Sequence, residues 1–295
     1  MKRVFHYIIV ALWTVAALIT SACSAKSGKE QPSDIAVTIL PLKYIVESIT
    51  DNDFEVEVMV PKGASPETYE PTPKQLIKLN ESQMIFSTGL IDFENALLGR
   101  IENQKAIINL SKGINLIEGS CSHNHAHSNS HTHAHGIDPH IWTSPRELKI
   151  MAKNAYDAIM QHYPDSAKYH TAYKALVDEF DQLDKQCEQM CLDSKTEAFV
   201  VYHPALTYFA RAYGIEQIAV ESDGKEPSAK HLAHIIDEAK AKNARCILYQ
   251  VQYPRSVVEV VAKDMGCECI EFDPLEENIT ENILHITRTI TGIKQ

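Results

Sequence analysis

A run of alternating histidines is the part of this chain most clearly suited to chemistry. The residues between them are Ser, Asn, Thr and Ala, which favour neither a helix nor an apolar strand, so we expect the imidazoles to be solvated. In an extended chain, alternate side chains share one edge about 7 Å apart, and neutral imidazole binds zinc, copper, nickel and iron. Residues 119–136 therefore form a candidate metal-binding loop, although a solvated insert without a ligand has the same composition. The histidines are His123, His125, His127, His131, His133 and His135.

Four further side chains that can bind metal ions lie in connections between predicted strands and helices, two of them directly after a strand. Ligands of an open parallel sheet bind beyond the carboxyl ends of its strands, so these connections should face a shared edge. Taken singly, each has a structural explanation as a core histidine, a helix cap, an ordinary turn or a surface carboxylate. Together, ligands that converge on one cleft from each half of the chain could hold a buried ion. The four are Glu67, His140, His203 and Asp273.

Hydrophobic periodicity predicts an α/β fold with two lobes, each a mostly parallel sheet flanked by helices. Short apolar runs alternate with helical stretches before residue 110 and again after residue 197, which indicates βαβ units. Between them lie amphipathic stretches at 146–162 and 165–191, and the second is long enough for a helix of about 40 Å that joins the lobes. The predicted strands are 35–40, 54–60, 84–87, 106–109, 198–202, 215–220, 246–250 and 267–272, and the remaining predicted helices are 42–50, 73–81, 93–102, 204–213, 227–243, 254–265 and 276–291.

The first residues have the features of an export signal. Lys2 and Arg3 precede an apolar run, residues 7–19, that is too short to span a bilayer, and small residues then lead to Cys23. This pattern predicts cleavage before Cys23 and its acylation, so the protein should be exported and attached to a membrane by lipid; cleavage nearby without acylation is the alternative. Residues 23–33 would then be a flexible tether.

The net charge argues against one class of partner, and the cysteines allow disulfides. The chain carries a formal charge of -11, and removal of residues 1–22, with two basic and no acidic residues, makes it -13. An acidic surface disfavours nucleic acid. Six cysteines follow residue 23, and export permits disulfides, but the sequence leaves their pairing open. The cysteines are Cys121, Cys187, Cys191, Cys246, Cys267 and Cys269.

The candidate ligands lie within longer motifs that resemble a known family. The motifs are Ser-Pro-Glu-Thr-Tyr-Glu-Pro-Thr-Pro at 65–73, Asp-Pro-His-Ile-Trp at 138–142, Tyr-His-Pro-Ala-Leu-Thr-Tyr-Phe-Ala at 202–210, Lys-Glu-Pro-Ser-Ala at 225–229 and Glu-Phe-Asp-Pro-Leu at 271–275. Their residues and order are similar to the metal-specific solute-binding lipoproteins of ABC importers, the ZnuA/TroA type, from about residue 34 onward. This resemblance implies one ion in the cleft between two lobes, a rigid helix joining them, and delivery to a membrane permease.

The resemblance also assigns ligands. His140, His203 and Asp273 match the family's metal ligands, whereas Glu67 stands where the family usually has histidine. A set of two imidazoles and two carboxylates is harder than three imidazoles, which moves the preference slightly towards Mn²⁺ or Fe²⁺. Zinc also accepts carboxylate oxygen, and a histidine at position 203 together with a His-rich loop resembles the zinc importers of the family. We therefore expect Zn²⁺, with Mn²⁺ or Fe²⁺ as alternatives.

Two other functions share these features. An exported zinc hydrolase could use two histidines and a carboxylate, but the sequence has no His-Glu-x-x-His motif, and Glu70 is the nearest candidate for a general base. A metal-storage or adhesion lipoprotein could use the His-rich loop alone. A separate metal pair at His231 and His234 with Glu238 is a further possibility on a predicted helix. We predict a binding protein rather than an enzyme, acting as a monomer with a permease.

These inferences give a domain organisation. We predict a signal peptide at 1–22, a lipidated tether at 23–33, an N-terminal metal-binding lobe at 34–145 that contains the His-rich loop 119–136, a linking helical region at 146–195, and a C-terminal metal-binding lobe at 196–295.

Overall fold

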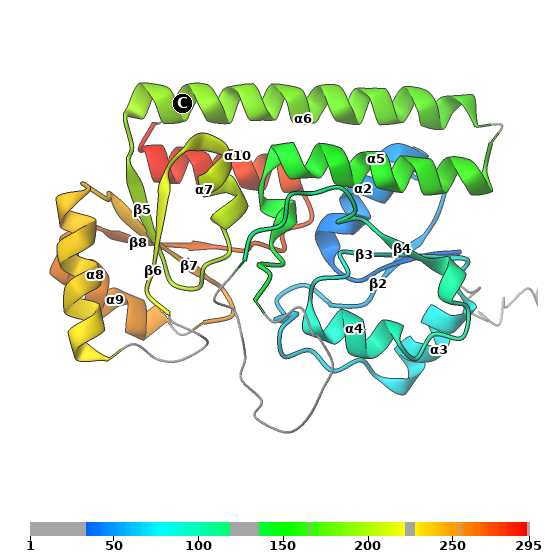
Figure 1. The fold of residues 1–295 in the computed structure, drawn as a ribbon, viewed down its shortest axis with the longest axis horizontal. Coiled ribbons are helices and arrows are strands. Elements are labelled where there is room, and N and C mark those ends of the chain that lie inside the picture. The colour runs from blue at the N-terminus through cyan, green and yellow to red at the C-terminus, as the bar shows by residue number, and fades with distance from the viewer. Residues whose placement is uncertain (1–33, 119–135, 165, 222–227, 254, 294–295) are drawn as a thin grey trace, which may run out of the picture. The chain divides into compact units, whose positions relative to one another are not determined.

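Two four-stranded sheets, each made only of parallel strand pairs, form the framework (Figure 1). The computed structural model describes residues 34–118, 136–164, 166–221, 228–253 and 255–293, and all of these belong to one compact unit, Ser33–Gln295. The expected α/β class with two lobes joined by a long helix is therefore confirmed. The signal peptide, Cys23 and the six histidines from His123 to His135 lie outside the described residues.

The two sheets have the same strand order relative to the chain. In each, the first strand lies between the second and the third, and the fourth strand forms the other edge. Parallel pairing brings the carboxyl ends of neighbouring strands to one edge, where the connecting loops begin. The first sheet contains β1 (Ile35–Val37), β2 (Val56–Val58), β3 (Met84–Ser87) and β4 (Ile107–Asn109), and the second contains β5 (Ala198–Val201), β6 (Glu216–Ala219), β7 (Cys246–Gln250) and β8 (Glu268–Phe272).

Helices connect the strands, and most of them begin close to the residues expected from the sequence. The first helix begins at Leu40 rather than at residue 42, because Pro41 suits the first turn of a helix, where no backbone donor is needed. The helices are α2 (Leu40–Thr50), α3 (Pro73–Glu81), α4 (Asp92–Leu98), α5 (Pro145–His162), α6 (Ala167–Ser194), α7 (Thr207–Tyr213), α8 (Ala229–Ala241), α9 (Arg255–Met265) and α10 (Ile279–Thr291), with short 3-10 turns at Gln104–Ala106 and Ile141–Thr143.

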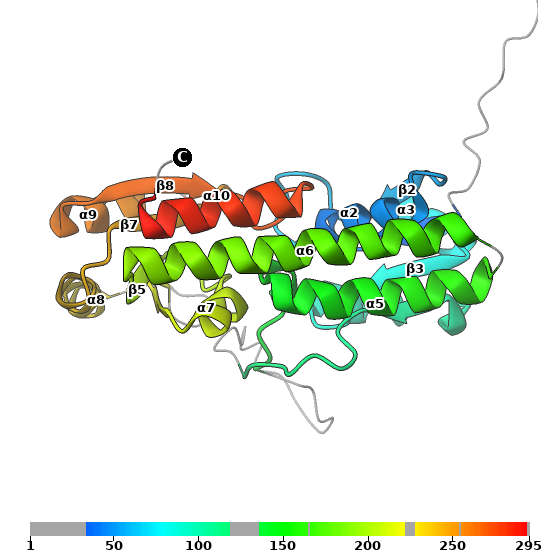
Figure 2. The ribbon, with the colours of Figure 1, turned by 90° about the horizontal axis from the view of Figure 1, so that it is seen from above.

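Helix α6 spans both sheets. Its 28 residues correspond to a length of about 42 Å, and it packs against α2 and α5 from the first half of the chain and α10 from the second (Figures 1 and 2). Its buried positions Tyr169, Leu176, Phe180, Leu183, Cys187 and Cys191 recur every three to seven residues, so they line one face of the helix.

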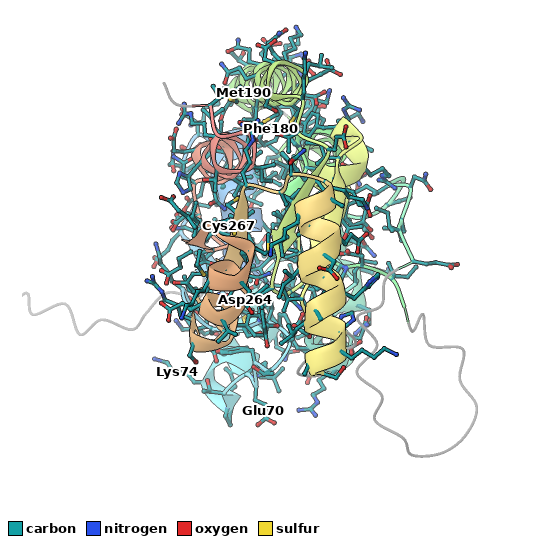
Figure 3. The ribbon with its side chains drawn as sticks, turned by 90° about the vertical axis from the view of Figure 1, so that its left-hand side faces the viewer. Glu70, Lys74, Phe180, Met190, Asp264 and Cys267 are labelled. Carbon is teal, nitrogen blue, oxygen red and sulfur yellow. The ribbon has the colours of Figure 1, made fainter. Side chains whose placement is uncertain are left out.

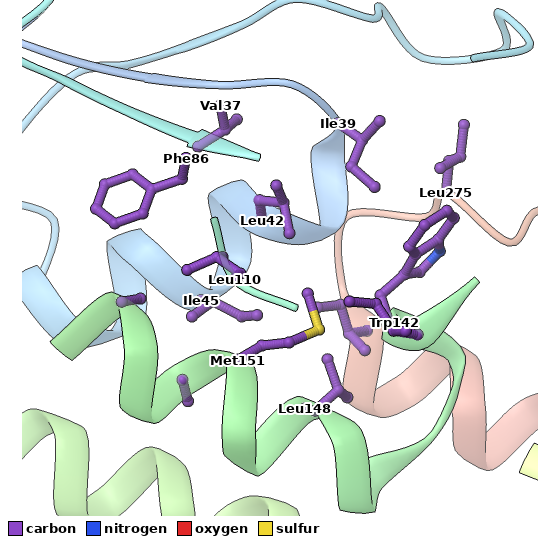
Figure 4. Packing of buried hydrophobic residues seen from close by; sticks show 14 of the residues in the cluster. Val37, Ile39, Leu42, Ile45, Phe86, Leu110, Trp142, Leu148, Met151 and Leu275 are labelled. Carbon is purple, nitrogen blue, oxygen red and sulfur yellow. The ribbon is translucent and has the colours of Figure 1, made fainter. Parts of the chain in front are cut away.

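One apolar core runs through both lobes. It joins Ile35 and Phe86 of the first sheet to Phe199 and Phe272 of the second, with Phe180 of α6 between them. Trp142 and Leu275, which flank the cleft, belong to the same cluster as Leu42 and Met151 (Figure 4). A second, smaller cluster fills the space between the other face of the second sheet and helices α8 and α9. These two helices lie side by side below α6, which is seen end-on at the top of Figure 3.

The strand register determines which face of the second sheet each cysteine of β7 and β8 occupies. Cys246 pairs with Glu268, and Ile247 pairs with Cys269, so Cys246 faces one side of the sheet and Cys269 the other. None of the five cysteines in the described ranges forms a disulfide. Burial raises the pKa of the Cys187 thiol to about 11 and those of Cys191 and Cys246 to about 12, which makes these thiols poor nucleophiles.

No helix in the described part of the chain combines the length and apolar character that crossing a bilayer requires.

Candidate metal centre

A small cavity lies where the loops that follow several strands of both sheets come together. Its volume, about 20 Å³, is enough for one water-sized particle. The loop after β2 supplies Glu67, the end of β5 supplies His203, and the turn before the Ile141–Thr143 segment supplies His140. The other residues that line the cavity are Ser65, Pro66, Trp142, Gln250, Gln252, Tyr253, Pro274 and Leu275.

Three potential metal ligands meet in this cavity. One donor atom from each of Glu67, His140 and His203 lies within 4.8 Å of the other two, and no other such group of three occurs among the described residues. His140 and His203 are 5% and 4% exposed, and their rings meet edge to face with centroids 5.3 Å apart. Glu67 Oε1 lies 2.9 Å from His203 Nε2. That nitrogen is buried, and the contact lacks the alignment of a hydrogen bond, so the geometry suits a shared cation.

A buried carboxylate fixes each histidine ring. Asp138 Oδ1 lies 2.9 Å from His140 Nδ1 and also accepts a 2.9 Å hydrogen bond from the His140 backbone N–H. Glu221 Oε2 lies 3.0 Å from His203 Nδ1. Because an ionised carboxylate can only accept, each Nδ1 carries a proton and donates it, which leaves Nε2 as the atom for an ion.

The charged groups of the site shift the pKa values of His203 and Asp138. Burial alone lowers the pKa of His203, but the hydrogen bond with Glu221 and the close negative charge of Glu67 outweigh it and raise the pKa to about 9. Burial likewise raises the pKa of Asp138, yet its contacts with His140 outweigh that effect and hold it below the usual range. Two carboxylates thus favour positive charge at the imidazole between them, as they would favour a divalent cation.

The loop that carries Glu67 is anchored at the start of α3. Thr72 Oγ1 accepts a hydrogen bond from the Gln75 backbone N–H, while Gln75 Oε1 accepts one from the Thr72 backbone N–H, which together form a capping box. The Gln75 amide donates to Met59 O (2.9 Å), just after β2, and Gln75 Oε1 also accepts from the Tyr69 hydroxyl. One side chain therefore ties both ends of the loop together.

Asp273 lies outside the group of three and does not line the cavity, although its neighbour Pro274 and its partner Gln252 do. Its Oδ1 accepts hydrogen bonds from the Leu275 backbone N–H (2.9 Å) and from Gln252 Nε2 (3.3 Å), and its carbonyl oxygen accepts one from Asn282. These contacts organise the turn before α10. The structure thus brings together three of the four residues predicted as ligands, and the assignment of Asp273 stays a prediction.

The base of the His-rich loop adjoins the metal centre. Glu118 and Ile137 form an antiparallel bridge, and the Asp138 backbone N–H donates to Ile117 O. The Tyr208 hydroxyl accepts from the Ile117 N–H and donates to Asp138 O, so α7 holds both sides of the base. The loop therefore returns to the fold two residues before His140.

The second possible metal pair, on α8, is not assembled. Glu238 accepts a hydrogen bond from Lys242 (2.8 Å) rather than facing a histidine ligand, and His234 is exposed. Within the described ranges, the donor atoms of His231, His234 and Glu238 do not all lie within 4.8 Å of one another. Solvent exposure therefore explains His234, whereas His231 is half-buried and its Nε2 has no hydrogen-bond partner among the described residues.

The sequence interpretation missed two residues that contact the candidate ligands. Glu221 lies two residues after β6, so it occupies a position beyond a strand end, where ligands of a parallel sheet are expected. Tyr253 lies just after β7, and its hydroxyl is 3.4 Å from Glu67 Oε2 across 186 positions of sequence. No local pattern indicates that contact.

Known proteins are similar to this chain in sequence and in fold. The family described as zinc-uptake complex component A, periplasmic (ZnuA) matches residues 35–292. The high-affinity zinc uptake system protein ZnuA of Bacillus subtilis is 28% identical over 280 residues, covering 90% of this chain and 88% of its own length. A crystal structure of ZnuA superimposes with a TM-score of 0.78 at 30% identity, covering 89% of this chain and 99% of that one.

A further relative is longer. The zinc-binding lipoprotein AdcA of Streptococcus pneumoniae is 25% identical over 288 residues, which cover 93% of this chain but only 56% of AdcA. With a family match over nearly the whole described chain and a shared fold, this protein belongs to the ZnuA family of metal-binding components of ABC importers.

Proposed function

We propose that this protein is an extracytoplasmic solute-binding protein that captures Zn²⁺ between its lobes and delivers it to an ABC permease. The observation that carries the proposal is the meeting of Glu67, His140 and His203 in one small cavity. The names of the Bacillus subtilis and Streptococcus pneumoniae relatives refer to zinc, and a solved structure with 30% identity is a ZnuA deletion mutant with zinc bound. Membership of an uptake family supports the permease as partner.

The donor set suits zinc. Zinc is usually four-coordinate in proteins and accepts both imidazole nitrogen and carboxylate oxygen. Two Nε2 atoms and one Glu67 oxygen supply three donors, and we propose that Asp273 or a water supplies the fourth. For Asp273 to ligate, its carboxylate must exchange the contact with Gln252 for the ion, while the nearby backbone contacts keep the turn in place.

The His-rich loop acts in this proposal as a weaker collector. Its histidines must be ordered before they can chelate, and the lost conformational entropy weakens binding. Its base at Glu118 and Ile137 keeps it attached beside the main site. We further propose that acylated Cys23 holds the protein at a membrane, as the name of the lipoprotein AdcA suggests for that relative.

Catalysis is not favoured by the geometry. A zinc hydrolase needs a general base within reach of a metal-bound water, and Glu70 was the nearest candidate in the sequence. Glu70 is exposed, lies at the lower edge of the molecule in Figure 3, and is absent from the cavity lining.

The test is a zinc titration of metal-free protein lacking residues 1–23, in competition with a chelator. We expect one tight site, and single replacements of His140 and His203 by Ala should each lower zinc affinity by orders of magnitude, since each leaves the ligand shell incomplete. His285→Ala, at an exposed position of α10, is the matched control and should bind as the wild type does. Wild-type affinity in both cavity variants would reject the site.

A deletion separates the cavity from the loop. A protein without residues 121–135 should keep the tight site and lose only weaker ions. These weaker ions should dissociate between about pH 7 and pH 5.5, because protons compete for imidazoles whose pKa is near 6.5. A deletion variant that has lost its tightest site would instead make the loop the binding centre.

A further inference from the structure

The two oxygens of the Glu67 carboxylate have different surroundings. Oε1 lies 2.9 Å from His203 Nε2 and faces the imidazoles, where an ion would be held. Oε2 faces the hydroxyl of Tyr253 at 3.4 Å. Tyr253 is the donor and Glu67 the acceptor, because an ionised carboxylate can only accept, and burial raises the pKa of the Tyr253 phenol above its ordinary value.

The position of the Tyr253 ring is set by packing. It stacks on the His203 ring with centroids 5.5 Å apart and planes 20° apart, and it also packs against Tyr202 at 4.9 Å. The Tyr253 backbone N–H donates to Gln250 O at the end of β7. Stacking on His203 therefore holds the Tyr253 ring in place, and its hydroxyl lies against the Glu67 oxygen that is not in contact with His203 Nε2.

We propose that Tyr253 is a specificity-determining residue of this site, which restricts Glu67 to a one-oxygen ligand and so favours a small four-coordinate ion such as Zn²⁺ over Mn²⁺. This inference rests on the proposed function. With Oε2 directed to the phenol, Glu67, His140 and His203 give three donors, and one more completes the tetrahedral shell that zinc prefers. A carboxylate that used both oxygens would add a donor and suit ions that take more oxygen ligands, such as manganese.

The expected size of the effect follows from the contact. An O–H···O distance of 3.4 Å exceeds the roughly 2.7 Å of a strong hydrogen bond, so its main role is to occupy one side of the carboxylate. We expect Tyr253→Phe, which keeps the ring stacked on His203, to lower the ratio of zinc to manganese affinity about three- to tenfold. Zinc affinity itself should change less than that ratio.

The experiment measures zinc and manganese affinities by chelator competition on the same preparations of wild type, Tyr253→Phe and a control, Tyr249→Phe. Tyr249 donates to Glu271 on the neighbouring strand, outside the cavity lining, so its replacement makes the same chemical change away from the ion. X-ray absorption of zinc-loaded Tyr253→Phe should show one additional oxygen neighbour. A ratio that moves equally in both variants, or in neither, overturns the inference.

A second background tests whether Tyr253 acts through Glu67. Glu67→His offers a single nitrogen at this position, so adding Tyr253→Phe to it should leave the metal ratio unchanged within about twofold. An equal shift in this background would show that Tyr253 acts by another route and would overturn the inference. Failure of the proposed function appears elsewhere, as the absence of a tight site in the wild type or as wild-type binding by His140→Ala and His203→Ala.

Discussion

His140 and His203 are held by different kinds of contact, although both reach the same cavity. The carboxylate that holds His140 belongs to Asp138, two residues earlier in the same turn, and it also bonds the His140 backbone. The carboxylate that holds His203 belongs to Glu221, which is 18 residues away and reaches it from the end of a neighbouring strand. The first histidine is thus positioned by its own turn, and the second by the pairing of β5 with β6.

This difference shows how each half of the site can fail. A change at Asp138 disturbs the backbone of the turn as well as the ring. A change at Glu221 frees only the ring, because the Gln250 side chain holds the His203 backbone N–H and carbonyl. Ring nitrogens held by carboxylates keep the correct tautomer and orientation for a metal ligand. The comparison therefore predicts unequal effects for two chemically similar substitutions.

The largest effect is expected from Asp138→Ala. The substitution removes the acceptor of both the His140 ring and the His140 backbone N–H in a buried turn, so zinc affinity should fall about 100-fold. The free energy of unfolding should also fall, by about 1–3 kcal/mol, because a buried donor is left without a partner. Chelator competition and chemical denaturation check the two expectations. Loss of affinity without loss of stability would contradict the backbone role.

A smaller effect is expected from Glu221→Gln. The amide oxygen can still accept from His203 Nδ1, but the negative charge is lost, so zinc affinity should fall about tenfold. Glu221→Leu, which cannot accept at all, should lower it further. The same titration measures both variants. If the two bind zinc equally, Glu221 does not act through the ring nitrogen.

The raised pKa of His203 predicts a pH dependence of stability in the metal-free protein. Its folded-state pKa, about 9, exceeds the ordinary histidine value of 6.5. The charged imidazole therefore stabilises the fold fully below pH 6.5, and this contribution is lost as the pH rises to 9. Across that window the free energy of unfolding should fall by up to about 3 kcal/mol more in the wild type than in His203→Gln. Denaturation in the presence of a chelator measures this. Parallel pH profiles would show that His203 is uncharged.

The smallest effect on the ion is expected from Trp142→Phe. Trp142 Nε1 donates to Pro274 O (2.8 Å) and so joins the turn after His140 to the turn after β8. Losing this hydrogen bond and part of a buried ring should reduce the free energy of unfolding by about 2 kcal/mol. Zinc affinity should stay within about threefold of the wild type, because no ligand changes and Phe keeps an aromatic ring beside His140, whose ring lies 5.3 Å from that of Trp142. A larger loss of affinity would mean that Trp142 positions His140.

Much of the fold could be predicted from the sequence because the signals were local. Parallel strands buried on both faces appear as short apolar runs, and Pro73 and Pro145 mark the first turns of α3 and α5. The long helix was expected at 165–191 and is found at Ala167–Ser194, where Lys195 ends it in a left-handed conformation. Helix ends of this kind depend on one or two residues, so errors of a few positions are expected.

The candidate site was only partly accessible to the same reasoning. Glu67, His140 and His203 could be selected because metal-binding side chains stand in connections between a predicted strand and a predicted helix. The roles of Glu221 and Tyr253 depend on which strands are neighbours, and β6 and β7 both flank β5 only in the folded sheet. For Asp273, the sequence cannot separate two roles. An aspartate that accepts a hydrogen bond from the backbone N–H two residues later has the same sequence pattern as an aspartate that binds metal.

The continuous core beneath α6 has a consequence for how the protein unfolds. Because the same buried cluster contains Phe86 from one sheet and Phe272 from the other, neither sheet can separate without exposing the apolar face of α6. Calorimetry should therefore record a single cooperative transition rather than two. Fragments divided between α5 and α6 should each be insoluble when expressed alone, and a zinc ion bound in the cleft should raise the melting temperature of the whole chain at once.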